Sequence, residues 1–246
     1  MHNAGACSPF LLVGDHAGNR IPRVLNELGL SATERKRHIA WDIGIAELGV
    51  RLADRLGASF IHQIYSRLVI DCNRRPGAPD SIPAISDRTK VPGNAALAAG
   101  EAEARAAAIH APYQEAIADE LERRAAQGLT TILVALHSFT PAMNGVERPW
   151  EVGLLYDAGD TRFARATLAA FAEDPQLTVG DNEPYSMDSI DFTIPFHAYP
   201  RELPYVEIEI RQDLLGTSAG IEQWSQRVER ALVSAARAIN LASVQR

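Results

Sequence analysis

Two histidines that follow apolar runs of strand length carry the clearest chemical signal in this sequence. His16 comes shortly after the run Phe10–Val13, and His137 directly follows Thr130–Leu136. In an open α/β sheet, ligands bind beyond the carboxyl ends of the strands. Imidazole is a common metal ligand, and a catalytic zinc ion usually takes three protein ligands and leaves one position open for water. We therefore predict that His16 and His137 supply two ligands of a metal site.

The third ligand of such a site must be a carboxylate or another histidine. Asp42 stands just before the predicted helix Ile43–Leu56, where an aspartate can instead cap the first backbone amides. Asp15 is adjacent to His16, and neighbouring side chains on a strand point to opposite faces, so we favour Asp42. The competing interpretation is that both histidines only form hydrogen bonds in loops. We assign the other five to terminal, helix-surface or loop positions: His2, His38, His62, His110 and His197.

The run Val206–Arg211 alternates strictly between apolar and charged residues, as a strand with two different faces does. Glu207, Glu209 and Arg211 share the charged face. In an edge strand this face would simply be solvated, which is the commoner explanation. If the strand lies inside a sheet covered by helices, its charges need partners, and a carboxylate beside a metal ion could act as a general base.

A group of polar residues brackets the predicted strand Leu68–Ile70, namely Arg67, Asn73, Arg74 and Arg75. An adjacent asparagine and arginine beside a pocket can clamp a carboxylate through a bidentate fork and an amide donor. On the residues alone, the commoner explanation is an arginine-rich loop whose members pair with Asp71 and Asp80.

The elements that must position these residues follow the pattern of an α/β protein. Apolar runs of strand length alternate with alanine-rich stretches of helical period, so we predict a single domain over residues 1–246, an α/β/α sandwich with a mixed, mainly parallel sheet. The predicted strands are Phe10–Val13, Ser59–Ile64, Leu68–Ile70, Thr130–Leu136, Val152–Tyr156, Gln176–Val179 and Val206–Arg211. The predicted helices are Ile43–Leu56, Ala99–Gln127, Thr161–Glu173 and Gly220–Ala242, with a short helix opened by the capping box Ser31–Glu34.

Two further stretches are predicted to be loops. Asn73–Asn94 is rich in Pro, Gly, Asp and Ser and is too long for a structureless connection without a function, so it is a candidate lid or substrate loop. Gly180–Phe196 is also loop-like.

The composition indicates which classes of molecule this protein binds. The net charge of −7 lacks the excess of Lys and Arg that binds nucleic acid. Two cysteines cannot form a disulfide framework, no apolar run approaches the ~20 residues that cross a bilayer, and the first residues lack the features of a signal peptide. We therefore expect a cytoplasmic protein that acts on a small molecule, without nucleic-acid or membrane partners.

The order of the candidate residues resembles the zinc carboxypeptidase superfamily: His16, Arg67, Asn73-Arg74, His137 and Glu209. Four segments are more closely similar to the N-formylglutamate amidohydrolase family, and the similarity covers about Phe10 to Leu215. These segments are Asp15-His16-Ala17-Gly18-Asn19-Arg20-Ile21-Pro22, Tyr65–Arg74, Leu136-His137-Ser138 and Glu207–Arg211.

The resemblance implies a three-layer fold of the phosphorylase/hydrolase-like type that holds one zinc ion. His16 and His137 would be metal ligands and Glu209 the general base, while the substrate carboxylate would be clamped by Arg67, Asn73 and Arg74. The chain departs from the carboxypeptidase pattern at Asn19, which stands where an acidic ligand is expected. Either Asp42 replaces that ligand or the metal site is altered.

From these residues and this resemblance we predict a zinc-dependent amidohydrolase that cleaves the amide of a small anionic N-formyl or N-acyl amino acid, such as N-formylglutamate. Arg67 would take part in catalysis, Ser138 would contact the substrate, and Arg211 would hold a second acidic group. The alternatives are a metallopeptidase or another deacylase with the same site, and a catalytically silent homologue that only binds carboxylates.

Overall fold

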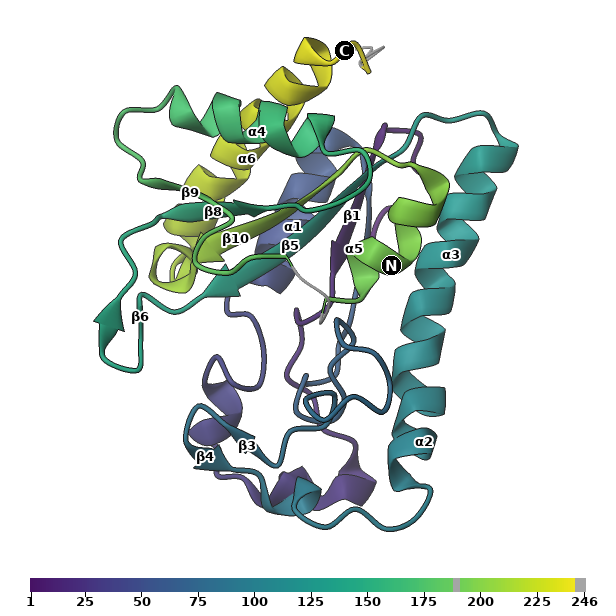
Figure 1. Cartoon of the computed structure of the whole chain (residues 1–246), viewed down its shortest axis with the longest axis vertical. Helices are drawn as coiled ribbons and strands as arrows, with labels where there is room; N and C mark the ends of the chain where they lie inside the picture. The colour runs from purple at the N-terminus through teal and green to yellow at the C-terminus, as the bar shows by residue number, and fades with distance from the viewer. Residues whose placement is uncertain (188–190, 242–246) are drawn as a thin grey trace.

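The computed structural model describes residues 1–187 and 191–241, and its centre is a six-stranded sheet (Figure 1). The strands lie in the order β2 (Ser59–His62), β1 (Phe10–Gly14), β5 (Ile132–Phe139), β10 (Tyr205–Arg211), β8 (Val152–Leu155) and β9 (Val179–Asp181). The first four are mutually parallel, β8 runs antiparallel to β10, and β9 is parallel to β8. The predicted mixed, mainly parallel sheet is therefore confirmed.

Helices flank this sheet. Helix α6 (Ser218–Ala238) packs against both α1 (Ile45–Leu56) and α4 (Arg162–Ala172). Figure 1 shows α1 behind the sheet and α5 (Thr193–His197) in front of it, beside α3 (Ala111–Ala126). Because helices cover both faces, β1 and β5 are buried along their whole length, which explains their continuous apolar sequences.

Short elements complete the described chain. Two hairpins are formed by β3 (Ile85–Ser86) with β4 (Thr89–Lys90) and by β6 (Ala142–Met143) with β7 (Val146–Glu147). Single 3₁₀ turns lie at Glu34–Lys36, Pro92–Asn94, Tyr199–Arg201 and Gln212–Leu215, and a kinked 3₁₀ segment lies at Arg23–Gly29. The capping box is confirmed, since Ser31 N donates to Glu34 and Glu34 N donates to Ser31 Oγ, at 2.8 and 3.2 Å. None of the described helices combines the length and apolar character that a membrane-spanning helix needs.

The predicted strand Leu68–Ile70 is wrong. These three residues are buried but lie in a turn, with Val69 N donating to Ser66 O. Their carbonyl groups bond to side chains instead of a neighbouring strand: Asn94 Nδ2 donates to Leu68 O, and Arg105 Nη1 donates to Val69 O. An apolar run signals burial, and here side-chain donors satisfy the buried backbone without a sheet.

Other boundaries shift without changing the architecture. The predicted helix Ala99–Gln127 contains a π-helical turn at Ala106–His110, between α2 (Glu101–Arg105) and α3. Pro112 follows this turn and lacks the N–H that an α-helix would use there. The predicted loops contain the β3–β4 hairpin, part of β9 and helix α5, and the predicted end of the last helix at Ala242 lies outside the described residues.

A crossing segment over the sheet edge, residues 182–187, depends on two glycines beneath it. A Cβ atom on Gly153 of β8 would lie 1.8 Å from the carbonyl oxygen of Glu183, and one on Gly180 would lie 2.7 Å from the same atom. Neither distance can accommodate a methyl group. The bare backbone at these positions lets the crossing segment approach closely and carry Tyr185 toward the carboxyl ends of the strands.

We expect Gly153→Ala to lower the free energy of unfolding by about 1–3 kcal/mol, because overpacking forces the backbone to move. The matched control is Gly216→Ala, where the nearest atom is 3.5 Å from the added Cβ and φ is −73°. Urea unfolding of both variants checks the difference, and equal midpoints would contradict the packing argument.

Candidate active site

A cavity of about 570 Å³ opens at the carboxyl ends of β1, β5 and β10. His137 and Glu209 line it from β5 and β10, and the two residues stand opposite each other in the parallel register. His16 enters from the loop after β1 and Asp42 from the segment before α1. The parallel register of the central strands thus brings together residues that are far apart in the sequence.

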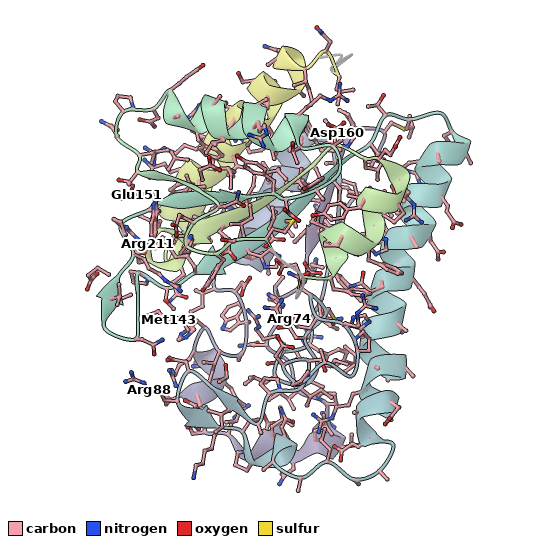
Figure 2. The ribbon with its side chains drawn as sticks, in the orientation of Figure 1. Arg74, Arg88, Met143, Glu151, Asp160 and Arg211 are labelled. Atoms are coloured by element: carbon pink, nitrogen blue, oxygen red, sulfur yellow. The ribbon has the colours of Figure 1, made fainter. Side chains whose placement is uncertain are left out.

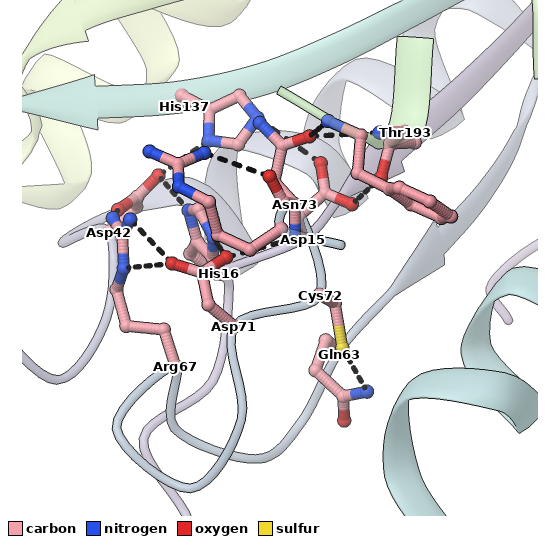
Figure 3. A network of polar contacts seen from close by, with 12 residues as sticks. Asp15, His16, Asp42, Gln63, Arg67, Asp71, Cys72, Asn73, His137 and Thr193 are labelled. Carbon is pink, nitrogen blue, oxygen red and sulfur yellow. Dashed lines mark hydrogen bonds and ion pairs between the residues drawn. The ribbon is translucent and has the colours of Figure 1, made fainter. Parts of the chain in front are cut away.

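His16, Asp42 and His137 converge in the floor of this cavity (Figure 3). Asp42 Oδ2 lies 3.4 Å from His16 Nδ1 and 2.9 Å from His137 Nδ1. All three residues are buried, and one ligand atom from each falls within a span of 4.8 Å. Asp42 is no helix cap, because α1 begins after Gly44 without a side-chain cap bond. The three predicted ligands therefore form a group that could hold a metal ion.

Two further carboxylates contact the opposite nitrogens of the two imidazoles. His16 Nε2 lies 2.6 Å from Asp71 Oδ1, and His137 Nε2 lies 3.2 Å from Asp15 Oδ2. Asp15 is held in turn by the Thr193 hydroxyl, which donates to Oδ1 at 2.5 Å. Metal-binding histidines usually place their second nitrogen against such a group, which fixes the ring orientation. Each imidazole is thus oriented with Nδ1 toward Asp42.

Sequence reasoning missed the roles of Asp71 and Asp15. Asp71 was considered only as a partner for arginines, and Asp15 only as a rival third ligand. The available signal was position, since Asp15 adjoins His16 and Asp71 lies two residues before Asn73. The structure shows a direct contact between these two near neighbours: Asn73 N donates a hydrogen bond to Asp71 Oδ1 at 2.9 Å.

Electrostatics in this cluster favour bound positive charge. Burial opposes protonation of His16, yet Asp71 and Asp42 outweigh it and raise the pKa of His16. Burial likewise opposes the charged form of His137, but Glu207, Asp15 and Asp42 raise its pKa well above the usual value. The pKa of Asp42 is lowered, because the two histidines overcome the cost of burial. A divalent cation can replace the protons on the two imidazoles, since metal ligands must be deprotonated.

Glu209 presents an unsatisfied carboxyl oxygen beside this cluster: its Oε2 is buried without a hydrogen-bond partner in the described chain, as is Asp15 Oδ2 next to His137 Nε2. Burial raises the pKa of Glu209 to about 7; the imidazole of His137 opposes the rise, and Asp42 adds to it. Strand β10 lies between β5 and β8, so its charged face is not that of an edge strand. Glu209 thus has the environment of a general base that works near neutral pH.

The donor set fits zinc. Two imidazole nitrogens and one carboxylate oxygen are typical ligands of a catalytic zinc ion. His16 Nδ1, like Glu209 Oε2, is buried without a hydrogen-bond partner in the described chain. A cation between His16, Asp42 and His137 would satisfy that nitrogen.

The predicted carboxylate clamp reaches the cavity, but its members already have partners. Arg67 donates to Asp71 Oδ2 from Nε at 3.0 Å and from Nη2 at 2.7 Å. Arg74 donates to Asp80 at 2.8 Å and to Asp191 at 3.3 Å. The Asn73 amide oxygen accepts from the backbone N–H groups of residues 192 and 193, both at 2.9 Å, which ties the entry of α5 to the site.

Of the remaining predicted site residues, one lines the cavity and the others do not. Ser138 lines the cavity, and its hydroxyl donates to the carbonyl of Ile43 at 3.0 Å. Arg211 does not line the cavity: it pairs with Glu151 and Asp213, and Figure 2 shows it beside Glu151 and away from Arg74. Asn19 donates to the carbonyl of Arg35 and does not line the cavity, so it is not part of the cluster.

Comparison with known proteins assigns the chain to a family. The family model described as N-formylglutamate amidohydrolase matches residues 8–216. The chain belongs to the N-formylglutamate amidohydrolase family. This confirms the resemblance seen in the sequence.

Solved structures of similar proteins share the fold of this chain. The gene product Atu2144 of Agrobacterium tumefaciens is 37% identical to this chain, with a TM-score of 0.94 over 97% of this chain and 94% of that one. An N-formylglutamate amidohydrolase from Ralstonia eutropha is 20% identical, with a TM-score of 0.68 over 97% of both chains, and this similarity shows a shared fold. None of the curated proteins matches the chain.

We expect the wild-type protein to bind one zinc ion per chain. His16→Ala or His137→Ala should lower the affinity by at least about 100-fold, since even the loss of an outer partner of a metal ligand costs up to that much. His38→Ala is the matched control, because His38 lines the same cavity outside the cluster. Competition with a chelator measures the affinities, and equal losses in all three variants would contradict the assignment.

The raised pKa of Glu209 predicts a pH dependence of stability in the metal-free protein. The fold favours the protonated form of Glu209. Its contribution to the free energy of unfolding is therefore complete below the pKa that Glu209 has in the unfolded chain, and it is lost as pH rises through about 7. The Glu209→Gln variant cannot ionise at this position. Between pH 4 and pH 8, its free energy of unfolding should rise by about 1–3 kcal/mol relative to that of the wild type. Urea unfolding with chelator present measures this difference, with Glu151→Gln as the surface control. A difference that stays constant with pH would show that the pKa of Glu209 is the same in the folded and unfolded states, which would contradict the raised pKa.

Proposed function

We propose that this chain is a zinc-dependent hydrolase that cleaves the amide bond of small N-formyl or N-acyl amino acids. The observation that carries the proposal is the buried group His16, Asp42 and His137 with Glu209 beside it, in one cavity of a chain of the N-formylglutamate amidohydrolase family. Zinc held by these ligands would lower the pKa of water and polarise the acyl carbonyl.

Glu209 supplies the proton transfers of this reaction. Its Oε2 accepts the proton of the attacking water, and the same oxygen then delivers that proton to the nitrogen of the leaving amine. One carboxyl group can serve both steps when its pKa lies near the working pH, and in the metal-free protein burial raises the pKa of Glu209 to about 7. Its lack of a hydrogen-bond partner within the described chain leaves Oε2 able to receive the proton.

The substrate carboxylate would bind to the two guanidinium groups that line the cavity. Arg67 donates three hydrogen bonds to Asp42 and Asp71. A guanidinium has five N–H donors, so Arg67 retains donors for one carboxylate. Asp71 and Asp42 hold Arg67 in place, which keeps the direction of those donors fixed. Arg74 and Ser138 line the same cavity and would complete the contact surface.

We expect the zinc-loaded protein to hydrolyse N-formyl or N-acyl amino acids faster than dipeptides of the same residues. Glu209→Gln should lower kcat by about 10²–10⁴ because it removes the proton acceptor, while zinc binding persists. Glu151→Gln, outside the cavity, is the control. A Glu209→Gln protein with wild-type turnover would refute the base, and a zinc-loaded wild type inactive on the whole panel would refute the proposed function.

A further inference from the structure

The charges around the cavity lead to a narrower substrate class than the family name suggests. We infer that the cavity selects N-acyl amino acids whose side chain is uncharged or cationic and discriminates against a second carboxylate, such as that of N-formylglutamate. This inference rests on the proposed function and concerns the substrate of the same site.

Carboxyl groups outnumber cations on the described part of the cavity wall. Seven carboxyl groups line it against two guanidinium groups and three imidazoles. Two of the imidazoles would be neutral as metal ligands. Burial lowers the pKa of the third imidazole, His38, so it is counted as neutral. Even if Glu207 and Glu209 are protonated and a divalent ion is present, five carboxylates exceed the four positive charges of the two arginines and the metal. The cavity is therefore acidic in its loaded state.

The two cations of the wall are already engaged with carboxylates of the chain. Arg67 bonds to Asp71 and Asp42, and Arg74 bonds to Asp80 and Asp191. Each arginine keeps two N–H donors, and we assign these donors to the α-carboxylate of the substrate, because the positive charge of each guanidinium is already shared between two carboxylates. A second carboxylate on the substrate side chain would need another cation.

The mouth of the cavity offers carboxylates and apolar groups to that side chain. The most exposed lining residues mark the mouth: the Asp80 side chain is 47% exposed, Ile85 62% and Tyr185 40%. Asp87 lines the same cavity, where it contacts the imidazole of His38 at 3.3 Å and pairs with Arg37, which is not among the lining residues. An anionic side chain placed here would face Asp80 and Asp87, and like charges repel.

Two nearby arginines could bind a second substrate carboxylate if they faced the cavity, but neither of them lines it. Arg211 pairs with Glu151 and Asp213 outside the cavity. Arg148 lies over the Phe139 and Tyr185 rings, 5.9 and 4.8 Å from their centroids, and does not line the cavity. Its Nη1 donates to the Tyr185 hydroxyl at 2.9 Å, so it supports the aromatic wall from behind the lining residues.

The test compares N-formylglutamine with N-formylglutamate, which have the same shape and differ in charge. With the zinc-loaded enzyme we expect kcat/KM to be at least tenfold higher for the glutamine compound. Asp80→Asn and Asp87→Asn should each reduce this ratio at least about threefold by raising kcat/KM for the glutamate compound. Asp213→Asn, outside the cavity, should leave the ratio unchanged.

A ratio near one, or a preference for N-formylglutamate, would overturn the inference while the proposed function stands. A preference for N-formylglutamate that is lost in Arg148→Gln would assign the second carboxylate to Arg148. If neither compound is hydrolysed, the proposed function fails for them, and calorimetric titration of both into zinc-loaded Glu209→Gln protein still decides the selectivity. Tighter binding of the glutamine compound would support the inference, and equal or weaker binding would refute it.

Discussion

The buried carboxylate of Asp42, placed between two imidazoles, is the interaction on which the rest of the site depends. Burying an ionised carboxylate is costly unless opposite charge compensates it. Here His16 and His137 present Nδ1 to the same oxygen of Asp42, and each ring is backed by another carboxylate, Asp71 or Asp15. The cluster is electrostatically arranged to hold positive charge, which protons supply in the metal-free protein and a metal ion can supply in the loaded one.

The sheet makes this cluster possible by aligning the ends of its central strands. β1, β5 and β10 are parallel neighbours, so residues at their carboxyl ends meet at one edge of the sheet. Helices on both faces exclude water from the floor of the cavity, and the same burial raises the pKa of Glu209 toward neutrality. The affinity of the cluster for a metal ion and the raised pKa of Glu209 therefore have the same cause, which is the burial of these charged groups away from water.

The sequence was informative where chemistry follows strand periodicity. Strand ends and alternation predicted His16, His137 and the charged face of Glu209, because side-chain direction along a strand is fixed. Asp71 and Asp15 were missed because their contacts depend on the path of loops, which periodicity does not describe. Arg211 shares a face of the strand with Glu209. Alternation predicts on which face a side chain lies but not whether it reaches the cavity, and Arg211 does not line the cavity. Leu68–Ile70 was misassigned because burial alone produces an apolar run.

In the proposed metal site, two imidazole Nδ1 atoms and Asp42 hold one metal ion, with Asp71 and Asp15 on the opposite nitrogens. A crystal structure of the zinc-loaded protein, with anomalous scattering measured on both sides of the zinc absorption edge, would show whether they do. We expect one zinc peak bonded to Nδ1 of His16, Nδ1 of His137 and a carboxylate oxygen of Asp42, with Glu209 facing it. A peak bonded through either Nε2 atom, or one located away from these three residues, would contradict the proposed site.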